Sequence, residues 1–112
     1  MVGNCHCRDC QRVSGSPMIS SLFFPTESTE INGSVRYFDA LADSGNRFSR
    51  GFCPNCGSSL FGRSSGLPHL IAIRVLALEN PEAYRPRVNI FTDSAPSWHV
   101  FDDAIPKFSR GP

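Results

Sequence analysis

The hydrophobic positions of this chain fall into short runs that turn residues separate. Apolar and aromatic side chains either alternate with polar ones or gather briefly, and glycine, proline or asparagine follows. No run keeps the spacing of three and four residues that marks an amphipathic helix. Short runs rich in β-branched and aromatic residues, bounded by turn formers, are typical of strands. The pattern therefore predicts a mainly β protein built from antiparallel strands.

Five segments carry strand signals. The most apolar run, residues 69–78, places Ile71, Ile73 and Val75 on one face of a strand, and β-branching favours a strand over a helix. The other predicted strands are residues 18–24, 35–38, 47–52 and 88–91.

The segments between these strands are predicted to be loops. Residues 11–17 are polar and rich in turn formers, and residues 79–82 allow a single helical turn at most. Residues 58–66 are rich in serine and glycine, and we assign no strand there.

Length and composition indicate a single domain over residues 1–112, with one modest core. The net charge is +1, so no overall field favours nucleic acid or a membrane surface as a partner. No apolar run approaches transmembrane length, and no secretory or lipidation signal is visible. We expect a cytoplasmic protein that binds neither nucleic acid nor membranes.

All five cysteines lie in two groups. Cys5, Cys7 and Cys10 form a C-x-C-x-x-C pattern, and Cys53 and Cys56 form a C-x-x-C pattern. A C-x-x-C turn directs both sulfur atoms to one point, and zinc takes sulfur ligands at about 2.3 Å in a tetrahedron. The glycine that follows the second pair suits a tight turn because it tolerates a positive φ. The spacing predicts one or two Zn²⁺ ions as cofactor.

Other uses of these cysteines fit less well. Disulfides suit an even cysteine count, and a redox C-x-x-C pair normally opens a helix, whereas no helical period follows Cys56. Two zinc arrangements stay open on spacing alone. Two of the first three cysteines could join Cys53 and Cys56 in a closed structural site, or Cys5, Cys7 and Cys10 could share one zinc with an open fourth position.

Four motifs in this order carry a family resemblance. They are Cys5-His6-Cys7-x-x-Cys10-Gln11-Arg12-x-Ser14-Gly15, Arg50-x-Phe52-Cys53-x-x-Cys56-Gly57-Ser58, Ala95-Pro96-x-Trp98 and Asp102-Asp103-x-Ile105-Pro106-x-Phe108. Together they resemble the glutathione-dependent formaldehyde-activating enzyme family, which also includes centromere protein V. The resemblance implies the β-tent fold, in which small antiparallel sheets meet around zinc.

The resemblance also implies roles for the cysteines. Cys5, Cys7 and Cys10 would hold a catalytic zinc, and Cys53 and Cys56 would hold a structural one. The other two ligands of the structural zinc come, in the family, from an earlier C-x-C pair that this chain does not contain. We therefore expect a short member whose first strands are missing. Because the burial that those strands would supply is lost, we expect an exposed apolar edge or a homo-oligomer.

The expected reaction joins a thiol to a small carbonyl. An open zinc position accepts the thiolate of glutathione or a similar thiol, which attacks formaldehyde or a similar carbonyl to give an adduct such as S-hydroxymethylglutathione. The enzyme would be a carbon–sulfur lyase. Three thiolates and Zn²⁺ sum to about −1, so Arg8 and Arg12 are predicted to balance the site, although both could simply face solvent. With Ser14 they are the candidate substrate-binding residues. The alternative function is a non-catalytic binding module that zinc stabilises.

Overall fold

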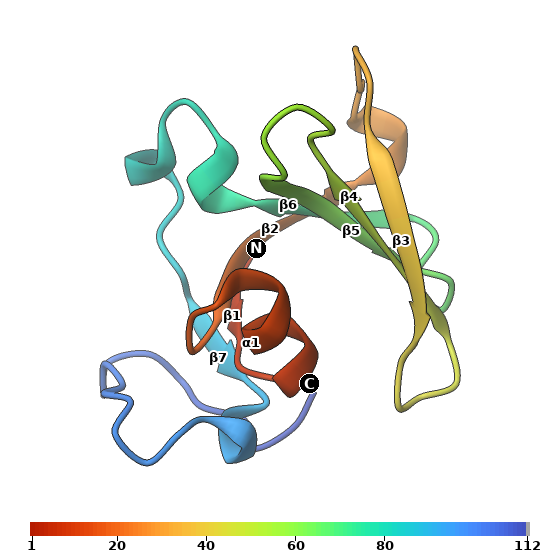
Figure 1. Cartoon of the computed structure of the whole chain (residues 1–112). Coiled ribbons are helices and arrows are strands. Elements are labelled where there is room, and N and C mark those ends of the chain that lie inside the picture. The colour runs from red at the N-terminus through yellow and green to blue at the C-terminus, as the bar shows by residue number, and fades with distance from the viewer. Residues whose placement is uncertain (112) are drawn as a thin grey trace.

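A computed structural model describes residues 1–111 of the chain, and it is mainly β, as the sequence predicts. Its strands form one seven-stranded sheet in the order β3-β4-β5-β6-β2-β1-β7 (Figure 1). The strands are β1 (Val2–Cys5), β2 (Ile19–Pro25), β3 (Arg36–Leu41), β4 (Arg47–Phe52), β5 (Ser59–Ser64), β6 (Leu70–Arg74) and β7 (Val88–Ile90). Neighbouring strands are antiparallel except β1 and β7, which are parallel.

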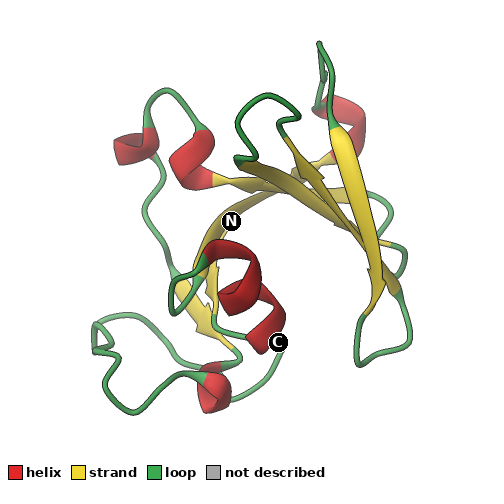
Figure 2. Cartoon of the chain, viewed as in Figure 1, coloured by secondary structure: helices red, strands yellow, loops and turns green. Residues whose placement is uncertain are grey.

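The sheet bends so that its two ends face each other. In Figure 2 the strands β3, β4 and β5 stand on one side, β1 and β7 on the other, and β2 and β6 connect them. Side chains from both ends line one pocket, which confirms that the ends face each other. Glycine permits close packing within this bend: a Cβ at Gly62 would lie 2.6 Å from the Phe48 ring.

The predicted strands are present, and two further strands lie where none was predicted. β4 covers the predicted residues 47–52, and β2, β3, β6 and β7 overlap their predicted segments. β6 ends at Arg74, so Val75 begins a 3₁₀ turn instead of continuing the strand. β1 is only four residues long, and β5 is the serine- and glycine-rich segment. Both gain their strand structure from pairing with neighbours on each side.

The prediction of a loop over residues 11–17 is wrong in its first half, because α1 (Arg8–Ser14) continues into it. The Cys7 Sγ accepts a hydrogen bond from the Cys10 backbone N–H at 3.4 Å and caps the start of the helix. At the end, Gly15 has a φ of 68° and donates its N–H to the Gln11 carbonyl. Caps at both ends stabilise a helix that is too short to show a period in sequence.

The remaining helical elements are single 3₁₀ turns. They are η1 (Thr26–Ser28), η2 (Val75–Ala77), η3 (Pro81–Ala83) and η4 (Thr92–Ser94). η3 is the helical turn that residues 79–82 allowed. Within residues 1–111 no helix is both long and apolar enough to cross a membrane.

Buried polar groups fix the position of β1 between β2 and β7. The Asn4 side-chain amide donates to the Asn89 side-chain oxygen at 3.0 Å, and the Ser20 hydroxyl donates to the Asn4 oxygen at 2.6 Å. Val2, Ile19 and Ile71 form part of the apolar core beside them. Because β1 ends at Cys5, this network sets the place at which the first cysteine group begins.

Candidate metal centre and its pocket

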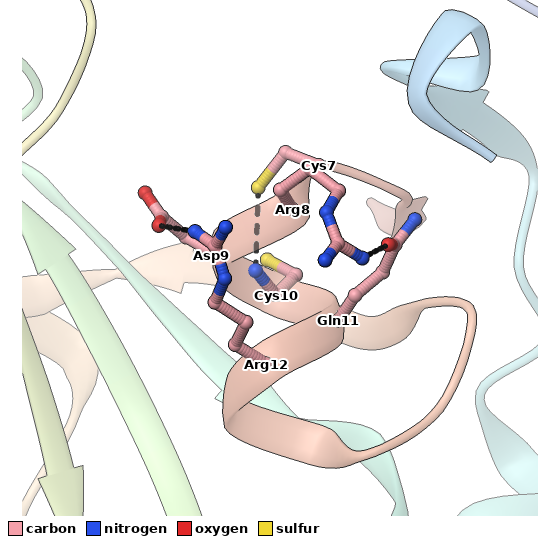
Figure 3. A network of polar contacts seen from close by, with 6 residues as sticks. All are labelled: Cys7, Arg8, Asp9, Cys10, Gln11 and Arg12. Atoms are coloured by element: carbon pink, nitrogen blue, oxygen red, sulfur yellow. Dashed lines mark hydrogen bonds and ion pairs between the residues drawn. The ribbon is translucent and has the colours of Figure 1, made fainter.

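Cys5, Cys7 and Cys10 come together at the junction of β1 and α1. Cys5 is the last residue of β1, Cys7 caps α1, and Cys10 is the third residue of that helix. Their three sulfur atoms lie within 4.8 Å of one another. Cys10 is buried and the other two are half-buried. Figure 3 shows the Cys7 and Cys10 sulfurs side by side, above the first turn of the helix. We call these three residues the cysteine cluster.

The thiols of the cluster lie too close together to ionise independently. Hydrogen bonds from Cys10 and Cys5 lower the pKa of the Cys7 thiol. Hydrogen bonds to Cys5 and Cys7, followed by burial, raise the pKa of Cys10. For Cys5 the hydrogen bond with Cys10 lowers the pKa, but the one with Cys7 and burial together raise it. The cluster therefore favours one thiolate, at Cys7, and three thiolates together require a nearby cation.

The cluster fits a zinc ion. Thiolates are zinc ligands, and sulfurs at about 2.3 Å from zinc in a tetrahedron lie about 3.8 Å apart. The sulfur separations in the cluster stay within 4.8 Å, which agrees with this geometry. Three protein ligands leave the fourth tetrahedral position open. The cluster could thus hold a metal ion.

Cys53 and Cys56 form a separate knuckle in the turn after β4. The Cys53 N–H donates to the Ser58 carbonyl at 2.9 Å, and the Gly57 N–H donates to the Cys53 carbonyl at 2.8 Å. Gly57 has a φ of 76°, which confirms the conformation predicted for it. Cys56 is exposed, and its sulfur lies 3.0 Å from the Ser58 hydroxyl, whose hydrogen bond lowers the pKa of Cys56.

The structure does not bring the knuckle to the cluster. Among residues 1–111, the cluster is the one group of three or more Cys, His, Asp or Glu side chains close enough to share an ion. A closed zinc site with ligands from both cysteine groups is therefore not present among these residues. The assignment of Cys53 and Cys56 to a structural zinc stays a prediction.

The cluster opens into a pocket of about 420 Å³ between the two ends of the sheet. All three cysteines line it. Much of the remaining wall is apolar, and its largest apolar side chains are Phe23, Leu41, Phe48, Leu67, Ile90 and Phe91. A mostly apolar cavity with a few convergent polar groups is the usual form of a small-molecule site.

Two arginines that the sequence analysis did not single out for the site also line this pocket. Arg74, from β6, is buried at 7% exposure, and Arg50, from β4, is half-buried. Arg74 donates to the hydroxyls of Ser21 at 2.8 Å and Ser59 at 3.2 Å. Burial lowers the pKa of Arg74, the Cys10 sulfur opposes this, and Arg50 adds to it. The signal in the sequence was the arginine at the end of an apolar strand, a position that is usually buried.

The predicted substrate-binding residues do not line the pocket into which the cluster opens. Arg8 and Arg12 are exposed on the surface of α1, where Arg8 donates to the Gln11 side chain and Arg12 pairs with Asp9 at 3.8 Å (Figure 3). With Cys7 they line a smaller cleft of about 200 Å³ that also contains carboxylates. On the other side they line, with Trp98, a groove of about 540 Å³. The Ser14 hydroxyl donates to the Cys10 carbonyl at 2.8 Å. A substrate-binding role for these three residues stays a prediction.

His6 lies between two cysteines in sequence but packs elsewhere. Its ring is fully buried against His99 and Phe101, at centroid distances of 5.2 and 4.9 Å. Its Nδ1 lies 3.1 Å from the Ile90 carbonyl. Burial lowers the pKa of His6 despite this hydrogen bond. Trp98 is 73% exposed, so this aromatic residue does not pack in the core.

Comparison with known proteins agrees with this site. The family model described as glutathione-dependent formaldehyde-activating enzyme matches residues 1–94. The chain belongs to this family. In this formaldehyde-activating family member, the matched residues include both cysteine groups and both pocket arginines. Trp98 and the Asp102–Phe108 motif lie beyond residue 94. A comparison with curated proteins found no match.

Proposed function

We propose that this protein is a zinc-dependent carbon–sulfur lyase that joins glutathione, or a similar thiol, to formaldehyde or a similar small carbonyl. The observation that carries the proposal is the cysteine cluster: three thiols with adjacent sulfurs that line a pocket large enough for a small molecule. Membership of the formaldehyde-activating family supports it. In this proposal residues 1–112 form one zinc-binding domain.

The reaction is an addition in which nothing is oxidised. The sulfur of the thiol forms a bond to the carbonyl carbon, the carbon–oxygen π bond breaks, and the thiol proton is transferred to the oxygen. A zinc ion on Cys5, Cys7 and Cys10 would bind the sulfur of the thiol and would favour its deprotonated form, the thiolate. Since the product is a hemithioacetal, the same site also catalyses the reverse step.

The residues of the chain contribute position and environment. β1 and α1 hold the three sulfurs in place, because β1 is paired on both sides and α1 is capped at both ends. The apolar wall excludes water and strengthens electrostatic interactions within the pocket. Holding both reactants in one cavity supplies the gain from proximity. Arg8, Arg12 and Ser14 are retained as candidate contacts for the outer part of a peptide thiol.

Exchange spectroscopy tests the proposal directly. Glutathione and formaldehyde are mixed with the zinc-loaded protein, and NMR follows the rate of adduct formation and dissociation. We expect acceleration over buffer, and loss of that acceleration in Cys7→Ser, because an alcohol is a poor substitute for a zinc-bound thiolate. Cys56→Ser is the matched control, since it removes an exposed sulfur of the other group.

A rate equal to that of buffer, in protein that carries zinc, would contradict the enzyme assignment. The non-catalytic zinc-stabilised module would then account for the cluster better. Calorimetry with glutathione supplies the second measurement, because that module would not bind the thiol at its metal.

A further inference from the structure

The pocket beside the cysteine cluster contains two arginines that form no ion pair among the described residues. Neither Arg74 nor Arg50 forms an ion pair with an acidic side chain of residues 1–111. The recorded partners of Arg74 are two serine hydroxyls, which carry no charge. Arg50 stacks on the Phe48 ring at 4.6 Å from its centroid. Arginine stays protonated in proteins, so both groups remain cations.

Both guanidinium groups also retain unused donors. The Nη2 of Arg74 and the Nε of Arg50 are buried and have no hydrogen-bond partner in the described part of the chain. Leaving a buried charged donor unpaired costs free energy, so each guanidinium group keeps hydrogen-bonding capacity that the described residues do not satisfy. Gly62 brings one of these donors close to the backbone, because a Cβ there would lie 3.1 Å from the Arg74 Nη2.

The charge of the whole site points to an anion. Under the proposed function, three thiolates and Zn²⁺ sum to about −1, and two guanidinium groups add about +2, so about one positive charge is in excess. Asp9 and Asp43 also line the pocket, but both are exposed, and Asp9 pairs with Arg12. Water screens exposed charges much more than buried ones.

We propose that Arg74, assisted by Arg50, selects ligands that enter the pocket as anions. This inference rests on the proposed function for the location of the thiol. Two parts of a ligand could supply the anion: the sulfur itself, as a thiolate, or a carboxylate carried elsewhere on the thiol. By contrast, Arg8 and Arg12 on α1 are exposed to water, and Arg12 is paired with Asp9.

Calorimetry with three small thiols tests the proposal on the zinc-loaded chain. The thiols are 2-mercaptoethanol, 3-mercaptopropionate and cysteamine, which differ in carrying a neutral, an anionic or a cationic second group. We expect wild-type affinity to be lowest for cysteamine. Arg74→Gln should weaken 3-mercaptopropionate binding about tenfold or more, since a charge-assisted hydrogen bond is lost.

The other two thiols identify the source of the anion. If Arg74→Gln weakens 2-mercaptoethanol and 3-mercaptopropionate equally, the arginine acts on the thiolate. If it weakens 3-mercaptopropionate alone, the arginine binds the carboxylate. Either result supports the proposal, and in both cases Arg74→Lys should retain more affinity than Arg74→Gln because it keeps the charge.

Arg63→Gln is the matched control. Arg63 lies on β5 beside Ser64, which lines the pocket, but Arg63 itself does not line it and is exposed. If Arg74→Gln changes affinity no more than Arg63→Gln does, the proposal is overturned. It is also overturned if the lysine and glutamine variants lose the same affinity for all three thiols, which is the pattern of a purely structural residue.

Arg50→Gln keeps the test decisive if Arg74→Gln does not fold, as thermal melting would show. Arg50 is half-buried, and we expect its variant to weaken 3-mercaptopropionate binding several-fold, with no change counting against the proposal. The adduct-formation rate separates the two hypotheses. If the protein binds anionic thiols selectively but does not speed adduct formation, only the proposed function is overturned. If it speeds adduct formation and the Arg74 and Arg50 variants do so equally well, only this inference is overturned.

Discussion

The two cysteine groups both contain a C-x-x-C spacing, yet their surroundings differ. A glycine with positive φ follows Cys56 directly, whereas after Cys10 the first such glycine is Gly15, at the end of α1. The cluster combines a strand end, a helix cap and a buried helical residue, and its sulfurs line a pocket with two arginines. The knuckle is a single turn whose second cysteine is exposed and contacts a serine hydroxyl. Spacing sets how sulfurs point locally, whereas burial and neighbouring charge decide what chemistry they can support.

The largest expected effect is on zinc binding, and it distinguishes the cysteine cluster from the Cys53–Cys56 knuckle. Cys10→Ser removes a buried ligand from the cluster, and we expect at least about 100-fold weaker zinc binding, because even outer partners of metal ligands contribute 10–100-fold. Cys56→Ser should leave zinc binding at the cluster unchanged. Competition with a coloured chelator measures both variants. Equal losses would show that the two groups act on the same ion.

The next prediction concerns the wall of the pocket opposite the cluster. Gly62→Ala places a Cβ 2.6 Å from the Phe48 ring, which forces the ring or β5 to move. Overpacking of this kind costs about 1–3 kcal/mol of unfolding free energy. Urea denaturation measures this cost, and the double variant with Phe48→Leu should recover part of it. If the double variant recovers nothing, the Phe48 ring is not the obstacle.

A smaller effect compares the glycines that follow each group. Gly15 and Gly57 have φ values of 68° and 76°, so an alanine at either position is strained by about 1–2 kcal/mol. Gly15→Ala should also weaken zinc binding, because α1 carries Cys10, while Gly57→Ala should not. Melting temperatures and chelator competition give the two measurements. Weaker zinc binding by Gly57→Ala alone would reverse the assignment of roles.

The smallest expected effect is on the outer surface of α1. Arg12→Gln breaks an exposed ion pair with Asp9, so unfolding free energy should change by less than about 0.5 kcal/mol. The affinity of the Arg12→Gln variant for glutathione is the second measurement. An unchanged affinity would count against Arg12 as a substrate contact, whereas a clear loss would support the sequence-based prediction for Arg12.

Fold class and most strands could be predicted because they depend on local apolar runs. β6 is recognisable from Ile71 and Ile73, and β4 from its alternation ahead of Cys53. β5 and β1 could not be recognised, because a serine-rich or four-residue strand depends on partners far away in sequence. α1 depends on a sulfur cap at Cys7, an acceptor that ordinary capping patterns do not include.

The residues of the candidate site also divide into those that local sequence predicts and those that it does not. Cys5, Cys7 and Cys10 are close in sequence, so their proximity could be predicted from spacing. Arg50 and Arg74 reach the cluster through the bend of the sheet, which no local pattern encodes. Sequence reasoning therefore assigned the balancing charge to Arg8 and Arg12, the nearest arginines along the chain. The structure adds Arg50 and Arg74 as further cations that line the pocket, and a balancing role for Arg8 and Arg12 stays a prediction.

The parallel pairing of β1 with β7 has a consequence for folding. Cys5 of β1 pairs with Ile90 of β7, and the side-chain hydrogen bond between Asn4 and Asn89 joins residues 85 positions apart. Contacts this distant in sequence close slowly, since loop-closure entropy is lost before the contact forms. A nascent chain that has reached residue 87 contains every sulfur and both pocket arginines but not β7. Maturation of the site should therefore follow closure of the last strand, and pulse-labelled hydrogen exchange would show β1 protected late.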